Sequence, residues 1–223
     1  MDNTFLLTKS DFLLFLKTPR HLWADKHGLI DNTPSTFEIH VMKQGYEVEV
    51  LAKEHLENYV IKLDEDLVYQ RTFTDRQFIV KMDILIHKPA TESYDLYEVK
   101  SGTSIKKENI YDVTYQYLVV SKQIKIDRVF VLHLNTEYIW YSDLNLEELF
   151  NAEDVTQKVL ELKDEVDKLR DIALETALKP SQDSTQPCLN PNCCPCPDIC
   201  YPGLPEFSIF DIPRLSKKRK MIY

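Results

Sequence analysis

Three charged side chains lie within two apolar, strand-like runs, where a buried sheet would normally exclude charge. Asp83 lies in FIVKMDILIH, and Glu98 and Lys100 lie in YDLYEVK. Residues two positions apart on a strand point to the same face, so Glu98 and Lys100 share a face. A turn around KPATES would pair the two runs as a hairpin and bring Asp83 beside them. The spacing therefore predicts two carboxylates and one ammonium group on one face of a sheet.

These side chains could hydrolyse phosphodiester bonds if they held a metal ion. Carboxylate oxygens are hard ligands that suit Mg²⁺ or Mn²⁺, and the backbone carbonyl of Val99 is a further candidate ligand. The ion would polarise a phosphoryl group and activate a bound water, while Lys100 would orient that water or neutralise developing charge. The alternative interpretation places Asp83 at a sheet edge or in an ion pair with a lysine.

The D-x₁₄-E-x-K spacing of Asp83, Glu98 and Lys100 resembles the PD-(D/E)XK nuclease superfamily, and this resemblance implies a further carboxylate ligand on a helix that precedes the strands. Glu47 and Glu49 lie in QGYEVEVLAKE. Positions two apart on a helix point about 200° away from each other, so at most one of the two can serve. We prefer Glu47 as the metal ligand, and the alternative is that both are solvated surface charges.

The D-x₁₄-E-x-K pattern between two helices resembles the PD-(D/E)XK nuclease superfamily. Gln116, in DVTYQYLVV, is similar to the glutamine motif of its RecB-like branch, which includes CRISPR-associated exonucleases. The resemblance implies a restriction-endonuclease-like fold and a Mg²⁺- or Mn²⁺-dependent DNA nuclease, with single-stranded ends as substrate. It also implies a catalytic role for Gln116, in contact with the substrate or with Lys100. The alternative for Gln116 is a polar residue on a helix surface.

All five cysteines of the chain lie in the short segment PCLNPNCCPCPDICYPG. In a cytoplasmic protein, this clustering indicates metal binding rather than disulfides. Both Zn²⁺ and a [4Fe-4S] cluster take cysteine thiolates as ligands. The even spacing of Cys188, Cys194 and Cys200 resembles an uncharacterised bacterial RecB-like family, which implies these three as ligands, with Cys196 or Cys193 as the fourth.

Two further stretches also resemble this bacterial RecB-like family. SIFDIPRL, at residues 208–215, is similar to a motif of that family, and LTKSDFLLFLKTPRHLW is similar to its opening. In RecB-like relatives that carry a [4Fe-4S] cluster, one cysteine near the N-terminus completes the ligand set. Here Thr18 stands before Pro19 where the family has that cysteine. The sequence therefore leaves a cluster and a zinc site as open alternatives.

The elements around these motifs predict an α/β fold with a mixed central sheet flanked by helices. We expect residues 1–178 to form the nuclease-like core and residues 179–223 to form a Cys-rich segment with the start of a C-terminal extension. Expected helices cover residues 9–27 with a break at Pro19, 35–59, 106–123 and 145–178. Expected strands cover residues 67–74, 77–88, 94–101, 126–134 and 137–142.

Composition narrows the functional classes further. The 223 residues are 43% hydrophobic and 28% charged, as in ordinary globular proteins. A net charge of −9 argues against indiscriminate coating of nucleic acid but allows a local basic channel. Four glycines leave no Walker loop or G-x-G-x-x-G motif. The chain has no long apolar run and no leader, so we expect a cytoplasmic protein without membrane contact.

The expected partner is DNA, together with a possible further C-terminal domain or protein partner. The alternative function is a nuclease-fold module with little or no turnover, which binds nucleic acid or another protein. The acidic composition and the Thr18 departure favour this alternative, whereas the charges within the strands favour an enzyme.

Overall fold

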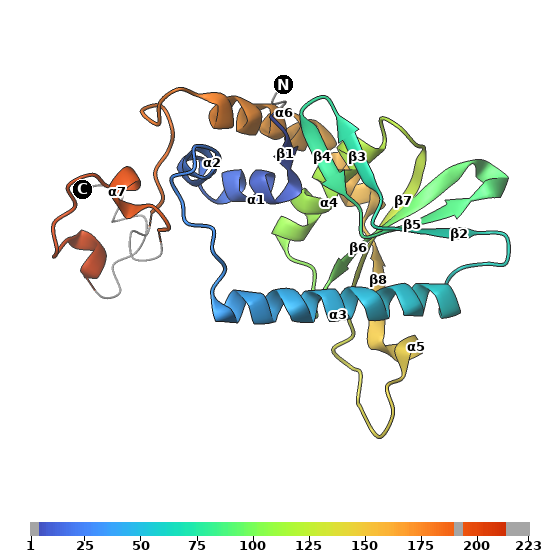
Figure 1. Ribbon diagram of the computed structural model, residues 1–223. Coiled ribbons are helices and arrows are strands. Elements are labelled where there is room, and N and C mark those ends of the chain that lie inside the picture. Colours follow the sequence, from blue (N-terminus) through green and yellow to red (C-terminus); the bar gives the residue numbers. More distant parts are fainter. Residues whose placement is uncertain (1–4, 190–193, 213–223) are drawn as a thin grey trace. The chain divides into compact units, whose positions relative to one another are not determined.

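The computed structural model describes residues 5–189 and 194–212 of the chain. The chain divides into two compact units (Figure 1). The sheet unit comprises residues 1–9 and 34–168, and the cysteine unit comprises residues 10–33 and 169–223. Residues 10–33 thus belong with the cysteine-rich segment, although most of the chain separates the two.

The sheet unit contains a five-stranded sheet with the strand order β2-β5-β6-β7-β8. Its central strands β6 and β7 run parallel, and the other neighbouring strands are antiparallel. Strands β5 and β6 form the predicted hairpin, joined through the short 3-10 helix Pro89–Thr91. The strand bounds are β2 (Asp66–Tyr69), β5 (Ile84–Lys88), β6 (Ser93–Lys100), β7 (Ile126–Leu134) and β8 (Phe150–Asp154).

A second, three-stranded sheet has the order β1-β4-β3. Its strands are β1 (Leu7–Thr8), β3 (Thr72–Asp75) and β4 (Phe78–Lys81). Strand β1 runs parallel to β4 and pairs Leu7 with Phe78. The predicted α/β class with mixed strands and flanking helices is confirmed, but the strands form two sheets rather than one.

Helix α3 (Thr36–Tyr59) covers one face of the five-stranded sheet (Figure 1). It begins with a capping box, in which Ser35 and Glu38 exchange hydrogen bonds between side chain and backbone. Ala52 and Leu56 in its second half pack against buried side chains of the sheet, among them Tyr97. This packing fixes which side of α3 faces the strands.

Helix α4 (Lys107–Val120) lies on the opposite face of the same sheet. Tyr97 of β6 points towards α3, so the alternating residue Glu98 must point away from α3, and its side chain meets Gln116 of α4. Almost every α4 residue from Ile110 to Val120 is buried, because the helix also contacts β3, β4 and β7. The face between β6 and α4 is therefore enclosed.

Four expected elements were wrong in detail. The strand expected over residues 67–74 is two strands, β2 and β3, which belong to different sheets. The strand expected over residues 77–88 is two strands, β4 and β5, which belong to different sheets, so the chain changes sheet at Met82 and Asp83. The helix expected over residues 145–178 contains α5 (Leu146–Leu149), then β8, then α6 (Thr156–Leu178). Only the first residue of β8 is buried, so its sequence lacks the alternation of apolar and polar residues that predicts a strand. Residues 137–142 form an irregular loop rather than a strand.

The cysteine unit joins two short helices to the cysteine segment. Helices α1 (Lys9–Lys17) and α2 (Pro19–Lys26) are separated at Thr18, whose extended backbone precedes a proline in the first turn of α2, as expected. Trp23 of α2 packs against a cluster that includes Cys188, Cys196 and Cys200. The segment also contains the short helix α7 (Pro197–Cys200) and the 3-10 helix Ile209–Asp211.

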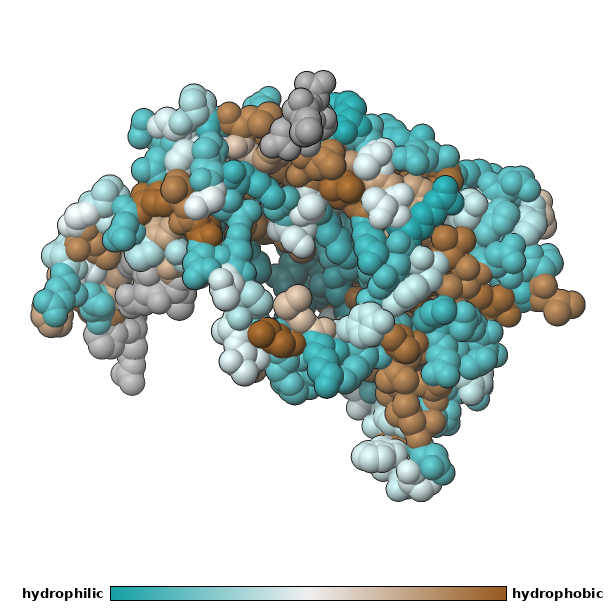
Figure 2. All heavy atoms as spheres, viewed as in Figure 1, coloured by the Kyte–Doolittle hydropathy of each residue, from teal (hydrophilic) through white to brown (hydrophobic). Residues whose placement is uncertain are grey.

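The exposed surface carries hydrophobic side chains among hydrophilic ones (Figure 2). In the sheet unit these include Phe37 and Met42 on α3, and Ile139, Trp140 and Tyr141 on the loop that follows β7. Within the described part of the chain, no helix combines the length and the hydropathy needed to cross a membrane.

Candidate active site and metal centre

Asp83 lies where the chain passes from β4 to β5, one residue before β5 begins. Its Oδ2 accepts a hydrogen bond of 2.9 Å from the backbone N–H of Val99, so the carboxylate is fixed against β6. Burial, followed by the negative charge of Glu98, raises the pKa of Asp83 well above its usual range, and the nearby Lys9 offsets only part of this effect. The structure thus brings Asp83, Val99 and Glu98 together at the open end of the hairpin formed by β5 and β6.

Glu98 is the most densely bonded carboxylate of this group, and its residue is only 1% exposed. Its Oε1 accepts hydrogen bonds from Lys9 Nζ at 2.9 Å and from Lys100 Nζ at 2.7 Å. Its Oε2 accepts from Lys9 Nζ at 3.2 Å and from Gln116 Nε2 at 2.8 Å. Burial alone would raise the pKa of Glu98, but the charges of Lys9 and Lys100 hold it well below its usual range. Glu98 is therefore ionised.

Lys100 is held between Glu98 and a carboxylate that the sequence analysis did not identify. Asp112 of α4 accepts a hydrogen bond of 2.6 Å from Lys100 Nζ on its Oδ2 and one of 2.9 Å from Gln116 Nε2 on its Oδ1. Burial would lower the pKa of Lys100, but the charges of Glu98 and Asp112 raise it above its usual range. A signal was present in the sequence, because Asp112 precedes Gln116 by one helical turn and shares its face.

Lys9 is a second residue that the sequence analysis missed. It directly follows β1, and β1 runs parallel to β4, the strand that leads into Asp83. This pairing carries Lys9 and Asp83 to the same end of the small sheet, where Lys9 Nζ lies 3.8 Å from Asp83 Oδ1. A hydrogen bond from the Tyr115 hydroxyl to the Leu7 carbonyl ties β1 to α4.

The structure places Glu49, rather than the preferred Glu47, beside this group. Glu47 is exposed and forms a surface ion pair with Lys43 at 3.9 Å. Glu49 is half-buried and accepts a hydrogen bond of 2.9 Å from Gln70 Nε2. The backbone N–H of Gln70 in turn donates to the Asp83 carbonyl at 3.0 Å. Gln70 thus links the strand end that carries Asp83 to the helix face that carries Glu49.

The carboxylates of this site fit a hard divalent cation. The Lys9 ammonium lies 2.9 Å from Glu98 Oε1 and 3.8 Å from Asp83 Oδ1, so both carboxylates stabilise positive charge at this position. Glu49 also acts on this site, because its negative charge contributes to the raised pKa of Asp83. An all-oxygen donor set of carboxylates is what Mg²⁺ and Mn²⁺ prefer. The arrangement can therefore hold a metal ion beside a lysine, and such an ion could polarise a phosphoryl group.

A different group of potential metal ligands lies in the cysteine unit. The ligand atoms of His21, Cys188, Cys194 and Cys200 all lie within 4.8 Å of one another, and His21 Nε2 lies 3.2 Å from Cys194 Sγ. This group could hold a metal ion. Three of these residues are among the ligands expected from the sequence, and His21 is the fourth member of the group.

Of the other two candidates for the fourth ligand, only Cys196 lies among the described residues. Cys196 Sγ lies 3.9 Å from Cys200 Sγ, but Cys196 is not one of the four converging residues. Cys193 lies outside the described residues. The sequence did contain a signal for His21. It lies one helical turn after Thr18, the position of the family's N-terminal cysteine, so its side chain lies on the same side of α2.

Arg20 links α2 to the residues around this centre by hydrogen bonds. Its guanidinium donates to the Thr185 hydroxyl at 3.1 Å and to the Cys200 carbonyl at 3.3 Å.

The thiols of the cysteine segment have raised pKa values. Burial raises the pKa of the Cys194 thiol, and burial also raises the pKa of the Cys196 thiol to about 11. Buried thiols of this kind bind a cation as thiolates only by releasing their protons, so metal binding here is coupled to pH.

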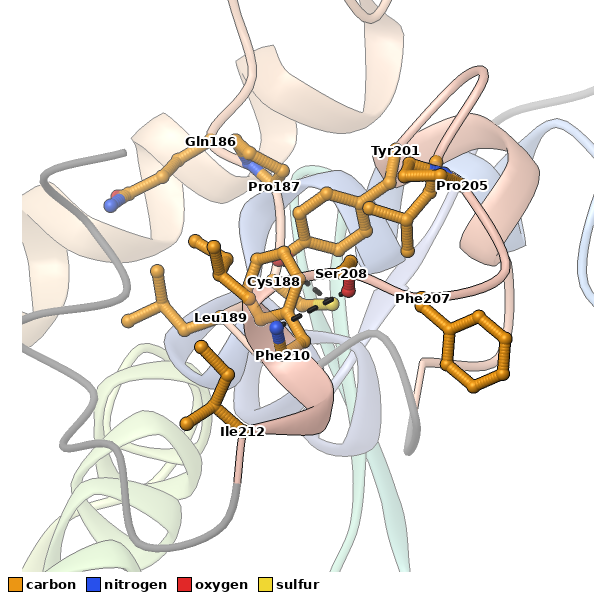
Figure 3. A pocket seen from close by; sticks show the side chains of 12 residues that line it. Gln186, Pro187, Cys188, Leu189, Tyr201, Pro205, Phe207, Ser208, Phe210 and Ile212 are labelled. Carbon is orange, nitrogen blue, oxygen red and sulfur yellow. Dashed lines mark hydrogen bonds between the residues drawn. The ribbon is translucent and has the colours of Figure 1, made fainter.

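A pocket of about 970 Å³ lies in the same unit, beside Cys188 (Figure 3). The rings of Tyr201, Phe207 and Phe210 form much of its wall. Among the described residues that line it, no side chain is charged. The pocket therefore offers a largely apolar surface that carries no charged side chain.

Comparison with known proteins gave only distant matches. No protein-family model and no curated protein matches the chain. Among solved structures, the chain is similar to an alkaline exonuclease, LHK-Exo, from Laribacter hongkongensis, with 13% identity over 77% of this chain and 89% of that chain and a TM-score of 0.48. The same exonuclease in complex with dAMP gives the same values. The protein SSO0001 is 9% identical over 76% of this chain and 78% of its own, with a TM-score of 0.39.

Proposed function

We propose that the chain is a metal-dependent nuclease that hydrolyses phosphodiester bonds of DNA. The observation that supports this proposal is the convergence of Asp83, Glu98 and Lys100 on the face between β6 and α4, with the Lys9 ammonium within ion-pair distance of both carboxylates. The resemblance to the RecB-like branch of the PD-(D/E)XK superfamily adds the expectation of single-stranded ends as substrate.

The side chains around the proposed ion have separate tasks. Asp83, Glu98 and Glu49 would hold Mg²⁺ or Mn²⁺, which would polarise the phosphoryl group and activate a bound water. Lys100 keeps its proton, because the neighbouring Glu98 and Asp112 raise its pKa. It therefore acts as a hydrogen-bond donor that orients the attacking water and stabilises negative charge, rather than as a base.

Gln116 serves this site as a positioning residue. Its amide nitrogen donates to both Glu98 and Asp112, and the residue is fully buried. Its Oε1 is buried without a hydrogen-bond partner among the described residues. These contacts support a role in holding Glu98 and, through Asp112, Lys100.

The test is cleavage of end-labelled single-stranded and double-stranded DNA with Mn²⁺. We expect the wild type to release nucleotides from the single strand, and Lys100→Met to be slower by about 100-fold, the usual effect of removing one donor to developing charge. Lys107→Met, at an exposed lysine of α4, is the matched control and should keep its activity. DNA that binds but is not cut by the wild type would instead indicate a binding module.

For the cysteine unit, we propose that His21, Cys188, Cys194 and Cys200 bind a single Zn²⁺ ion. Zn–S bonds of about 2.3 Å in a tetrahedron place neighbouring ligand atoms roughly 3.8 Å apart. The observed group, within 4.8 Å, supports this spacing. A [4Fe-4S] cluster binds each ligand to a different iron and would hold the ligands farther apart. Metal analysis of anaerobically purified protein decides: we expect zinc and no colour, and bound iron with a brown colour would contradict the proposal.

A further inference from the structure

Donors of the protein itself occupy the acceptor positions of Glu98. A carboxylate offers about four lone-pair positions. Glu98 receives two hydrogen bonds from Lys9, one from Lys100 and one from Gln116. A metal ion that binds Glu98 must therefore displace at least one of these donors.

Lys9 is the donor that is least firmly held. Lys100 also bonds to Asp112 at 2.6 Å, and Gln116 is fully buried and also bonds to Asp112. Both hydrogen bonds of the Lys9 ammonium go to Glu98, whereas Lys100 and Gln116 each bond to a second carboxylate. Displacing Lys9 breaks no other hydrogen bond of this network and leaves Lys100 and Gln116 in place.

The position of the Lys9 ammonium is also the position that a bridging cation needs. It lies 2.9 Å from Glu98 Oε1 and 3.8 Å from Asp83 Oδ1. A Mg²⁺ ion sits roughly 2.1 Å from its ligand oxygens, so the two carboxylates can close around it only if the ammonium has left. The two cations are mutually exclusive at this point.

We propose that Lys9 is the resident counter-cation of the site, and that a divalent ion binds Asp83 and Glu98 by displacing its ammonium. This inference rests on the proposed function, because it concerns the same metal position. Lys9 thereby supplies a positive charge beside Glu98 and Asp83 until the ion binds. Its displaced ammonium is then free to meet a polyanionic substrate.

The first experiment compares Mn²⁺ affinity, measured by electron paramagnetic resonance of free Mn²⁺, in the wild type and in Lys9→Met. Methionine keeps an unbranched side chain but removes the charge, so we expect binding about tenfold tighter or more, since the competing charge is within contact distance. Lys122→Met, at an exposed lysine of the same unit, should bind as the wild type does.

The second experiment uses the wild type alone, so that it does not depend on the folding of a variant. Acetylation of each lysine is followed by mass spectrometry with and without Mn²⁺. We expect Lys9 to react several-fold faster when Mn²⁺ is bound, whereas Lys100 should stay protected and Lys122 should stay reactive.

The outcomes separate this inference from the proposed function. Equal or weaker Mn²⁺ binding by Lys9→Met, or an unchanged acetylation rate of Lys9 in the presence of bound Mn²⁺, overturns the role of Lys9 and leaves the metal site standing. If neither protein binds Mn²⁺ at millimolar concentration, the metal site itself is refuted, and this inference is refuted with it.

Discussion

Asp112 Oδ2 lies 2.6 Å from Lys100 Nζ, so the lysine of the proposed active site is anchored from α4 as well as from its own strand. Asp112 is 2% exposed, and its second oxygen accepts from Gln116. Four side chains, Glu98, Lys100, Asp112 and Gln116, thus close a ring of hydrogen bonds between β6 and α4. The ring fixes where the Lys100 ammonium can point.

Replacing Asp112 should therefore impair catalysis without touching the metal ligands. We expect Asp112→Asn to lower the cleavage rate by about 10–100-fold, the usual effect of losing a residue that orients a ligand or catalytic group. Mn²⁺ affinity should change much less than the rate. Glu108→Gln, at an exposed position of the same helix, is the control. A variant with the rate of the wild type would show that Lys100 is positioned without Asp112.

Gln116 should matter for stability as well as for activity. Gln116→Leu removes two hydrogen bonds to charged carboxylates, each worth about 1.5–3 kcal/mol, and leaves Asp112 and Glu98 short of a donor. We expect the free energy of unfolding to fall by about 2 kcal/mol or more in urea titrations. Gln157→Leu, at an exposed position of α6, should change it little. Equal stabilities of the two variants would contradict the ring.

The two glutamates of α3 provide a matched pair. Glu49→Gln should weaken Mn²⁺ binding by about 10-fold, because the half-buried Glu49 carboxylate adds negative charge next to Asp83. Glu47→Gln should leave the affinity unchanged, because Glu47 is an exposed residue paired with Lys43. Titration calorimetry of both variants makes the comparison, and the reverse order of effects would restore the original preference for Glu47.

Metal binding should depend on pH through Asp83. Burial and the charge of Glu98 raise the pKa of Asp83, so the metal-free carboxyl keeps its proton above the pH at which an ordinary aspartate loses it. A metal ion must displace that proton, so Mn²⁺ affinity should rise with pH up to the raised pKa and level off above it. The affinity should change by about tenfold per pH unit below that point. An affinity that falls or stays constant as pH rises through this range would contradict the assignment.

His21 should be exchangeable for another metal ligand but not for an apolar residue. His21→Ala should lose the metal ion and lower the melting temperature of the cysteine unit, whereas His21→Cys should keep the ion with four sulfur ligands. His40→Ala, at an exposed histidine, is the control. Zinc content and thermal unfolding are the measurements. Retention of zinc by His21→Ala would mean that another group, such as Cys196, serves as the fourth ligand.

Strand periodicity and helix spacing were enough to predict the centre of the site. The alternation along β6 places Glu98 and Lys100 on one face, and the hairpin brings Asp83 beside them. The helix after β6 packs on that face, so Gln116 reaches Glu98. These relationships are local or follow from a short connection, and a single sequence carries them.

The residues that were missed depend on pairings that a single sequence does not show. Lys9 reaches Glu98 across 89 positions because β1 adds in parallel to β4. The choice between Glu47 and Glu49 depends on which face of α3 meets the sheet, and this is set by Ala52 and Leu56. His21 joins the cysteines only because residues 10–33 fold with the C-terminal segment.

The most direct test of the whole account is the cleavage rate of end-labelled single-stranded DNA as Mn²⁺ is titrated into the wild type and into Asp83→Asn. The account predicts a rate that is zero without metal, rises and saturates with Mn²⁺ in the wild type, and stays at least about 100-fold lower in Asp83→Asn. Cleavage by both proteins at the same rate, or no cleavage by the wild type at any Mn²⁺ concentration, would contradict it.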